Sequence, residues 1–200
     1  MLNDASTPLS LLATRRSGKP RDLVAPGPDA AQLTAILAIA ARTPDHGKLA
    51  PWRFVIVDPA QRAALAALFA EAFSAERPLA TAAERAALDQ FAHQAPTLVV
   101  ALFSPRIRSP IPLWEQELST GAACMNLLHA AHAQGFAGGW LTGWPAHSDM
   151  VRDAFGVAPE RIAGFFFIGT PARVLDERPR PDPVRVVSHW RAAGLDAGDI

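Results

Sequence analysis

The sequence has almost no cysteine, which removes several kinds of site from consideration. Of its 200 residues, only Cys124 carries a thiol. An internal disulfide and a cysteine-rich zinc site are therefore both excluded. No second histidine stands at metal-ligand spacing near His46, so we expect no metal centre there.

The chain also lacks net charge and long hydrophobic runs. Nineteen lysines and arginines balance nineteen aspartates and glutamates, and the pI is about 7.0. Balanced charge gives no long-range field for nucleic acid or for an anionic membrane, so we expect neither partner. Residues 1–17 lack the apolar core of a signal peptide, and no run is long enough to span a bilayer. We therefore expect a cytoplasmic protein.

What is present indicates one folded domain over residues 1–200. Half of the residues are hydrophobic and 19% are charged, which is not the composition of a disordered chain. Eighteen prolines cluster at 105–112 and 171–183. We interpret the first cluster as a boundary inside the domain, and the second as the start of an extended C-terminal arm, about 171–200.

Helical patterns alternate with apolar strand patterns along the chain. Capping residues and apolar stripes predict helices that begin near Pro8, Asp29, Pro59, Thr81, Trp114 and Asp149. Apolar runs predict strands at 53–57, 97–103 and 161–168, and 97–103 is expected to be central because it is apolar throughout. A β-branched run at 184–187 predicts an edge strand in the arm that pairs with another subunit.

Two polar segments are candidate ligand walls. At 42–57 a helix end, a loop containing His46 and a buried strand follow one another, which is a common way to build such a wall. Near the N-terminus, cations flank Ser17 and Gly18. This arrangement fits either a phosphate clamp or a solvated helix end, where cations are also favoured.

Two further segments allow more than one interpretation. The glycine-rich stretch 138–144 lacks a dinucleotide-binding fingerprint, because Pro145 stands where a helix would have to begin. It fits either close approach of the backbone to a flat ligand or a tight turn. Glu115 and Glu117 point to different sides of a helix, so charge preference at the helix start explains them better than a catalytic carboxylate pair.

Six segments in register resemble the nitroreductase family of flavin mononucleotide (FMN) enzymes, and most closely its compact bacterial NAD(P)H nitroreductase branch. They are residues 15–17, 42–46 with 51–52, 114–117, 133–136, 139–140 and 164–171, within about 9–190. The resemblance implies an α+β fold with a mostly antiparallel central sheet flanked by helices. It also implies a homodimer with FMN at the subunit interface and a C-terminal strand or arm exchanged between subunits.

The resemblance also implies which residues bind the cofactors. The FMN-binding residues would be Arg15, Arg16, Ser17, Lys19, Arg42, His46, Trp140, Leu141 and Thr142. The first three would hold the phosphate and ribityl end, Lys19 or Arg16 the pyrimidine edge, and Arg42 and His46 would come from the partner subunit. The residues assigned to the nicotinamide nucleotide would be Ala130, Ala131, His132, Ala133, Gln134 and Gly135. No side chain is expected to be catalytic, because the flavin carries the redox chemistry.

The implied activity is a ping-pong transfer of hydride from NADH or NADPH, through FMN, to a nitroaromatic, a quinone or a similar electron-poor small molecule. Three alternatives remain: a flavin storage or sensor protein, a relative that performs dehalogenation, ene reduction or flavin fragmentation, and a cofactor-free helical dimer. Ala50 stands where many relatives carry an amide, and Leu141 where an arginine often follows the tryptophan. These departures bear on substrate and reductant more than on the flavin.

Overall fold

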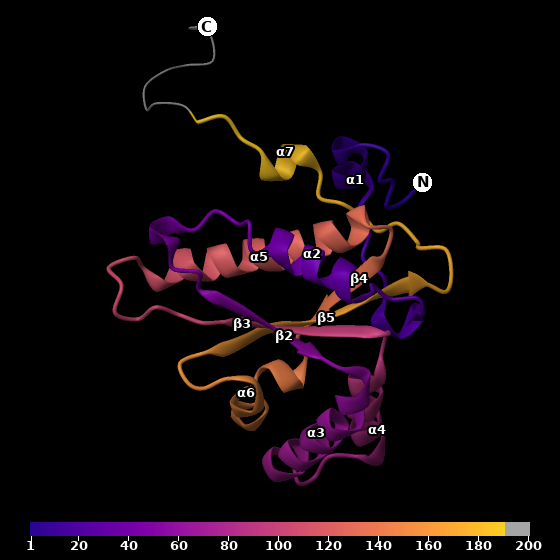
Figure 1. The fold of residues 1–200 in the computed structure, drawn as a ribbon, viewed down its shortest axis with the longest axis vertical. Helices are drawn as coiled ribbons and strands as arrows, with labels where there is room; N and C mark the ends of the chain where they lie inside the picture. The colour runs from indigo at the N-terminus through magenta and orange to yellow at the C-terminus, as the bar shows by residue number, and fades with distance from the viewer. Residues whose placement is uncertain (191–200) are drawn as a thin grey trace, which may run out of the picture.

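The computed structural model describes residues 1–190, which form a β-sheet between two helical layers (Figure 1). All strand pairings are antiparallel. The strands are β1 (Leu23–Val24), β2 (Trp52–Val57), β3 (Thr97–Phe103), β4 (Ala137–Leu141) and β5 (Arg161–Pro171). Their order is β1-β5-β3-β2, and β4 also pairs with β5. The predicted α+β class and antiparallel sheet are therefore confirmed.

Helices cover both faces of the sheet (Figure 1). One face packs against α3 (Arg62–Glu76), α4 (Ala82–His93) and α6 (Asp149–Phe155). The other packs against α2 (Ala30–Ala40) and the long α5 (Leu113–Ala133). The short helices α1 (Pro8–Thr14) and α7 (Pro183–Val186) lie beyond the α5 layer. Within residues 1–190, no helix is long and apolar enough to cross a membrane.

The two central strands are buried on both faces, which explains their unbroken apolar sequences. Along β3, Leu98 and Val100 face α3 and α4, whereas Val99 faces α2 and α5. Successive side chains of β5 alternate in the same way, with Phe165 on the first face and Phe166 on the second. The predicted position of residues 97–103 at the centre of the sheet is confirmed.

Local capping chemistry sets where several helices begin. The Asp29 side chain accepts from the N–H of Gln32, whose side chain in turn accepts from the N–H of Asp29, and this capping box starts α2. Thr81 and Glu84 form the same arrangement at the start of α4. Such caps are worth about 1 kcal/mol each, so the predicted helix starts follow from local sequence.

The predicted edge strand at 184–187 is wrong. Residues Pro183–Val186 form the short helix α7 instead, and its side chains are exposed. Asp182 explains the difference, because its carboxylate accepts from the N–H of Val184 at 3.1 Å, and proline is favoured at the first helical position. The part of the predicted arm at 191–200 lies outside the described residues.

The sequence prediction also missed two strands. Residues Ala137–Leu141 form β4 despite Gly138 and Gly139, and the turn follows only at Gly143, whose φ of 62° favours glycine. Hence the glycine-rich stretch is first a strand and then a turn. The two-residue strand β1 is too short to give a periodic signal.

Candidate functional site

The loop that follows α1 is fixed against the start of β4. The N–H of Gly18 donates to Gly138 O at 3.1 Å. Asn3 accepts from the N–H of Arg16 at 2.7 Å and donates to its carbonyl at 3.1 Å. A β-carbon at Gly139 would lie 2.8 Å from Gly18 O, so this close approach of loop and strand requires a glycine.

Arg15, Arg16, Arg178 and Arg180, which we call the arginine cluster, gather at this loop. Arg15 Nη1 donates to Ser17 Oγ at 3.2 Å, and Arg180 Nη2 donates to Arg15 O at 3.3 Å. Burial lowers the pKa of Arg15, and the charges of Arg180, Arg16 and Arg178 lower it further. The cluster therefore concentrates positive charge and is a ready site for an anion.

The C-terminal arm holds its part of the cluster in place through its own contacts. Arg16 Nε donates to the carbonyl of Asp176 at 2.7 Å. Arg180 pairs with Glu177 at 2.8 Å, which supplies one negative charge against four positive ones. Arg178 and Arg180 were not predicted as site residues, because they are far from Arg15 along the chain. The signal was present as two arginines with one proline between them in a proline-rich arm.

Two histidines of α5 lie near Arg15 without adding charge to the cluster. Burial, and then the charge of Arg15, lower the pKa of His129. Burial lowers the pKa of His132 to about 4, so both are mainly neutral at pH 7. His132 is buried together with Ala130 and Ala131. Only the outward-facing part of the predicted nicotinamide segment is therefore accessible.

The predicted flavin-binding residues 140–142 lie at the end of β4, but their side chains diverge. The indole of Trp140 lies on the α5 side of the sheet and packs on Phe166, with 5.1 Å between the ring centres. Its Nε1 donates a hydrogen bond to Ala163 O at 3.0 Å. Leu141 points to the opposite face and packs in the core there. Thr142 is exposed beyond the strand. The Leu141 side chain therefore cannot contact a ligand that lies on Trp140, and Leu141 can reach such a ligand only through its backbone.

The structure places His46 away from the arginine cluster within one chain. His46 Nδ1 lies 2.7 Å from Glu115 Oε2 at the start of α5. His129, which neighbours Arg15, lies fourteen positions further along α5, about 21 Å away at helical rise. Arg42 follows α2 and is exposed. The predicted site residues therefore form two groups, one around Arg15 and one around His46.

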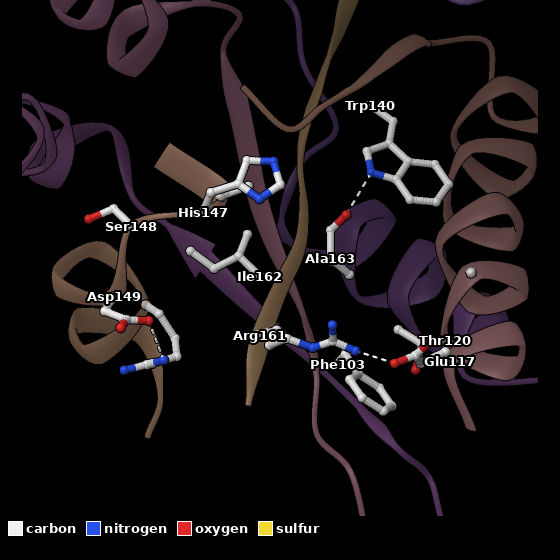
Figure 2. Close-up of a pocket in the computed structure, with 13 residues that line it drawn as sticks. Phe103, Glu117, Thr120, Trp140, His147, Ser148, Asp149, Arg161, Ile162 and Ala163 are labelled. Carbon is white, nitrogen blue, oxygen red and sulfur yellow. Dashed lines mark hydrogen bonds and ion pairs between the residues drawn. The ribbon is translucent and has the colours of Figure 1, made fainter. Parts of the chain in front are cut away.

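A cavity of about 440 Å³ opens beside Trp140 (Figure 2). It forms where β4 and β5 part, because β4 ends at Leu141 opposite Phe165 whereas β5 begins at Arg161. Its lining includes Phe103 and Ile162 of the sheet, Glu117 and Thr120 of α5, and residues 146–149 before and at the start of α6. Trp140 belongs both to this lining and to the predicted flavin-binding residues.

An ion pair between Arg161 and Glu117 spans the cavity wall (Figure 2). The guanidinium of Arg161 also lies 5.1 Å from the centre of the Phe103 ring, a cation–π contact. Glu115 pairs with His46 instead, which confirms that the two glutamates point to different sides of α5. From the sequence, Glu117 was predicted only as a helix-start charge, and its pairing with Arg161 was not predicted.

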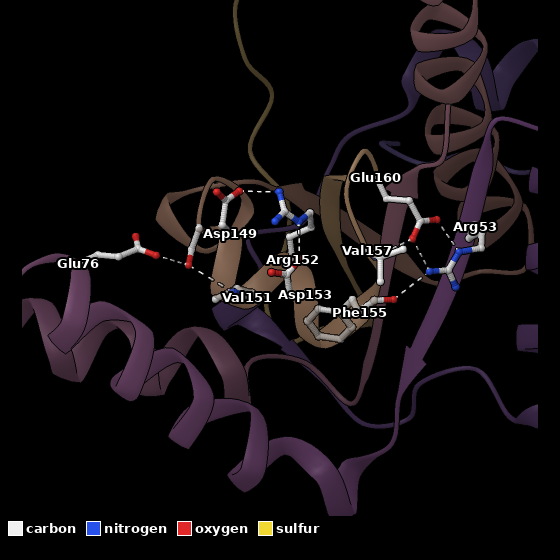
Figure 3. A network of polar contacts seen from close by, with 10 residues as sticks. Arg53, Glu76, Asp149, Val151, Arg152, Asp153, Phe155, Val157 and Glu160 are labelled. Atoms are coloured by element: carbon white, nitrogen blue, oxygen red, sulfur yellow. Dashed lines mark hydrogen bonds and ion pairs between the residues drawn. The ribbon is translucent and has the colours of Figure 1, made fainter. Parts of the chain in front are cut away.

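Polar contacts fix the wall of the cavity on the α6 side (Figure 3). Ser148 caps α6 and donates from Oγ to Glu76 at 2.6 Å. Arg152 pairs with Asp149 at 2.6 Å and with Asp153 at 2.7 Å. These contacts tie the first turn of α6 to α3 and to itself, so this wall does not depend on a ligand for its shape.

Next to this wall, Arg53 of β2 clamps Glu160 (Figure 3). Arg53 Nε and Nη2 donate to the two carboxylate oxygens at 2.8 and 3.0 Å. The hydrogen bonds from Arg53 are the main cause that lowers the pKa of Glu160 to about 2. The clamp positions the start of β5, and therefore Arg161, at the cavity.

Comparison with known proteins identifies relatives along nearly the whole chain. The sequence model described as Nitroreductase family matches residues 12–170. The chain is 34% identical over 184 residues to the protein named "Putative NAD(P)H nitroreductase YdjA" of Escherichia coli (strain K12), covering 91% of this chain and 98% of that protein. A Haemophilus influenzae (strain ATCC 51907 / DSM 11121 / KW20 / Rd) protein named "Putative NAD(P)H nitroreductase" is 39% identical over 169 residues, or 81% and 87% of the two chains.

Solved structures share the fold at lower sequence identity. The FMN and NADPH-dependent nitroreductase NfnB from sphigopyxis sp. strain HMH superposes with a TM-score of 0.70 at 21% identity, covering 94% of this chain and 99% of that one. At this identity, the likeness describes the fold alone.

Proposed function

Since the chain belongs to the nitroreductase family, we propose that it is an FMN-dependent oxidoreductase. It takes hydride from NADH or NADPH and passes electrons to electron-poor small molecules such as nitroaromatics or quinones. The arginine cluster is the observation that carries this proposal, because it is built for an anion and lies on the loop whose sequence resembles the family's phosphate clamp. The names of NfnB and of the two NAD(P)H nitroreductase relatives agree with it.

The residues present fit a flavin mononucleotide. Its phosphate matches Ser17 and the guanidinium groups of Arg15, Arg178 and Arg180, since arginine binds phosphate oxygens in a bidentate manner. The glycine at 139 leaves room where a side chain would collide with the loop. Beyond the loop, Trp140 and Thr142 are exposed at the end of β4, and Trp140 also lines the cavity. The phosphate site and this exposed strand end together provide a surface for the flavin, and the cavity remains beside them.

Within this site, each cation has a distinct role. Bound FMN supplies the redox chemistry. Arg15, with Ser17, holds the phosphate. Arg16 is engaged with the arm through Asp176, so we assign Lys19, which is exposed beside the loop, as the cation that stabilises negative charge at the pyrimidine edge.

We place two such sites at the interface of a homodimer. Trp114 and Leu118 are 62% and 65% exposed, one helical turn apart on α5, with Ala122 exposed on the next turn. The loop containing His46 borders this apolar stripe, so a second chain packed on the stripe brings His46 and Arg42 to its partner's flavin.

The dimer is tested by sedimentation velocity on Leu118→Glu. We expect monomers, because the substitution buries an unpaired charge in the interface. Leu79→Glu is the matched control, since Leu79 is an exposed leucine in the turn between α3 and α4 and should leave the dimer intact. If the Leu118→Glu variant remains a dimer, α5 is not part of the interface.

The activity is tested with purified protein and an anaerobic cell. We expect a yellow protein, or one that becomes yellow with FMN, and bleaching of the flavin band by NADH, NADPH or both. A second half-reaction, in which nitrobenzene derivatives or a quinone restore the band, establishes the ping-pong order. A colourless protein that FMN cannot reconstitute refutes the proposal. Bound flavin that neither nicotinamide bleaches indicates a storage protein instead.

A further inference from the structure

The cavity beside Trp140 offers apolar and aromatic surface to a small molecule. The rings of Trp140 and Phe103, with Ile162 and Ala163, provide apolar surface. Its volume of about 440 Å³ lies within the usual range of small-molecule sites, roughly 300–1,000 Å³. The start of β5, which pairs with β3 but is not reached by β4, forms one side, so the cavity follows from the strand geometry.

The charged groups in the cavity are arranged in compensating pairs. Glu117 neutralises Arg161 (Figure 2), and Arg152 pairs with Asp149 and Asp153 (Figure 3). Arg161 is restrained from two directions, by the Phe103 ring and by Glu117. Its remaining N–H groups are still donors, because a guanidinium carries five. A ligand in the cavity therefore meets a hydrogen-bond donor whose charge is already balanced.

We propose that this cavity binds the aromatic electron acceptor, and that Glu117, by pairing with Arg161, makes the site select uncharged acceptors over aromatic carboxylates. An oxygen of a nitro or quinone group accepts from Arg161 without requiring a free positive charge. A carboxylate is attracted by Arg161 but repelled by the negative charge of Glu117, and the attraction and the repulsion oppose each other. The inference rests on the proposed function, since it names the substrate class and the selectivity residue of the same enzyme.

The matched acceptors 4-nitrobenzamide and 4-nitrobenzoate test this selectivity, because they are nearly the same size and differ in charge. The measured quantity is the ratio of kcat/KM for the carboxylate to kcat/KM for the amide. In Glu117→Gln, Arg161 gains an uncompensated charge, and we expect the ratio to rise roughly 5- to 10-fold. In Arg161→Met, Glu117 is left alone and the ratio should fall.

Asp153→Asn is the matched control. It removes one negative charge from an ion pair with Arg152, but its carboxylate is not part of the cavity lining. We expect its ratio to equal that of the unaltered protein. An unchanged ratio in both Glu117→Gln and Arg161→Met, or an equal shift in Asp153→Asn, overturns the inference.

Binding without turnover separates this inference from the proposed function. Benzoate and benzamide carry no nitro group, so calorimetric titration of the oxidised, FMN-loaded protein reports the cavity alone. We expect Glu117→Gln to gain affinity for benzoate and to keep its affinity for benzamide. A loss of FMN affinity in Glu117→Gln, with benzoate binding unchanged, assigns the cavity to the flavin and overturns the inference. If the unaltered protein does not bind FMN, the proposed function itself is refuted.

Discussion

At the scale of single residues, Arg180 provides a direct test of the phosphate site. Its guanidinium reaches the carbonyl of Arg15, yet it belongs to the exposed arm, so its removal should not disturb the core. Loss of a charge-assisted hydrogen bond of about 1.5–3 kcal/mol weakens binding roughly 10- to 100-fold. We therefore expect Arg180→Ala to raise the Kd for FMN, measured by quenching of flavin fluorescence, by at least tenfold.

Arg173→Ala is the control for this measurement. Arg173 is also an arm arginine, but it pairs with Asp22 at 2.5 Å rather than with the arginine cluster. Its Kd for FMN should stay within about twofold of the unaltered value, since surface ion pairs contribute little. Equal effects of the two substitutions would indicate a general charge effect and would argue against a phosphate site at Arg180.

Glu160 predicts a specific dependence of stability on pH. Its pKa of about 2 in the folded protein is below the value of about 4.3 expected when unfolded. The carboxylate therefore stabilises the fold above about pH 4.3, and this contribution is lost as pH falls towards 2. The shift corresponds to about 3 kcal/mol as an upper estimate.

Urea unfolding of Glu160→Gln at pH 7, 4 and 3 measures this contribution. We expect the substitution to cost about 2–3 kcal/mol at pH 7, and the difference from the unaltered protein to shrink at pH 3. Glu71→Gln, at an exposed position of α3, should show a difference near zero at every pH. A loss of unfolding free energy in Glu160→Gln that is the same at every pH would contradict the lowered pKa of Glu160.

At the scale of elements, the sequence predicted those whose signal is local. The apolar runs of β3 and β5 and the capped starts of α2 and α4 needed no distant partner. By contrast, β4 contains two glycines in five residues and became a strand only because β5 pairs with it. The valines at 184–187 favoured a strand, but Asp182 and Pro183 start a helix there. Tertiary pairing therefore explains the strand that was missed, and local capping explains the strand that was wrongly predicted.

The same division applies to the site. Arg15, Arg16 and Ser17 are adjacent in sequence, and the structure keeps them together. The contacts Arg15–Arg180 and Glu117–Arg161 join residues 165 and 44 positions apart. No property of the single sequence fixes which residues of such distant segments meet, and so these partners could not be predicted.

Gly164 of β5 tests the packing of the elements around the cavity. A β-carbon there would lie 2.0 Å from Trp140 Nε1. We expect Gly164→Ala to displace the indole, to break its hydrogen bond to Ala163, and to destabilise the protein by about 1–3 kcal/mol. Thermal unfolding and a shift in tryptophan emission measure the two effects.

Gly138→Ala is the comparison for Gly164→Ala. Its β-carbon would lie 2.7 Å from the end of the Leu128 side chain, a less severe contact than the one at Gly164, so the loss of stability should be smaller. An unchanged emission spectrum in Gly164→Ala would show that the indole is not held where the structure places it.

At the scale of the whole molecule, the two groups of site residues predict how two chains cooperate. Arg15 and His46 lie at different ends of α5, so the proposed dimer completes each flavin site with Arg15 from one chain and His46 from the other. Arg15→Ala and His46→Ala should each weaken both sites of a homodimer, because every site then lacks one contact. The Arg15 variant should lose more, since it removes a charge-assisted bond to phosphate.

Mixed dimers distinguish this arrangement from one in which both residues serve the same site within a chain. In a heterodimer of Arg15→Ala and His46→Ala chains, shared sites place both defects in one site and leave the other intact. We therefore expect refolded or co-expressed heterodimers to bind one FMN per dimer with the Kd of the unaltered protein. If Arg15 and His46 act within one chain, each site keeps one defect and no site of unaltered affinity appears. Fluorescence titration of heterodimers purified with two different tags separates the two outcomes by stoichiometry alone.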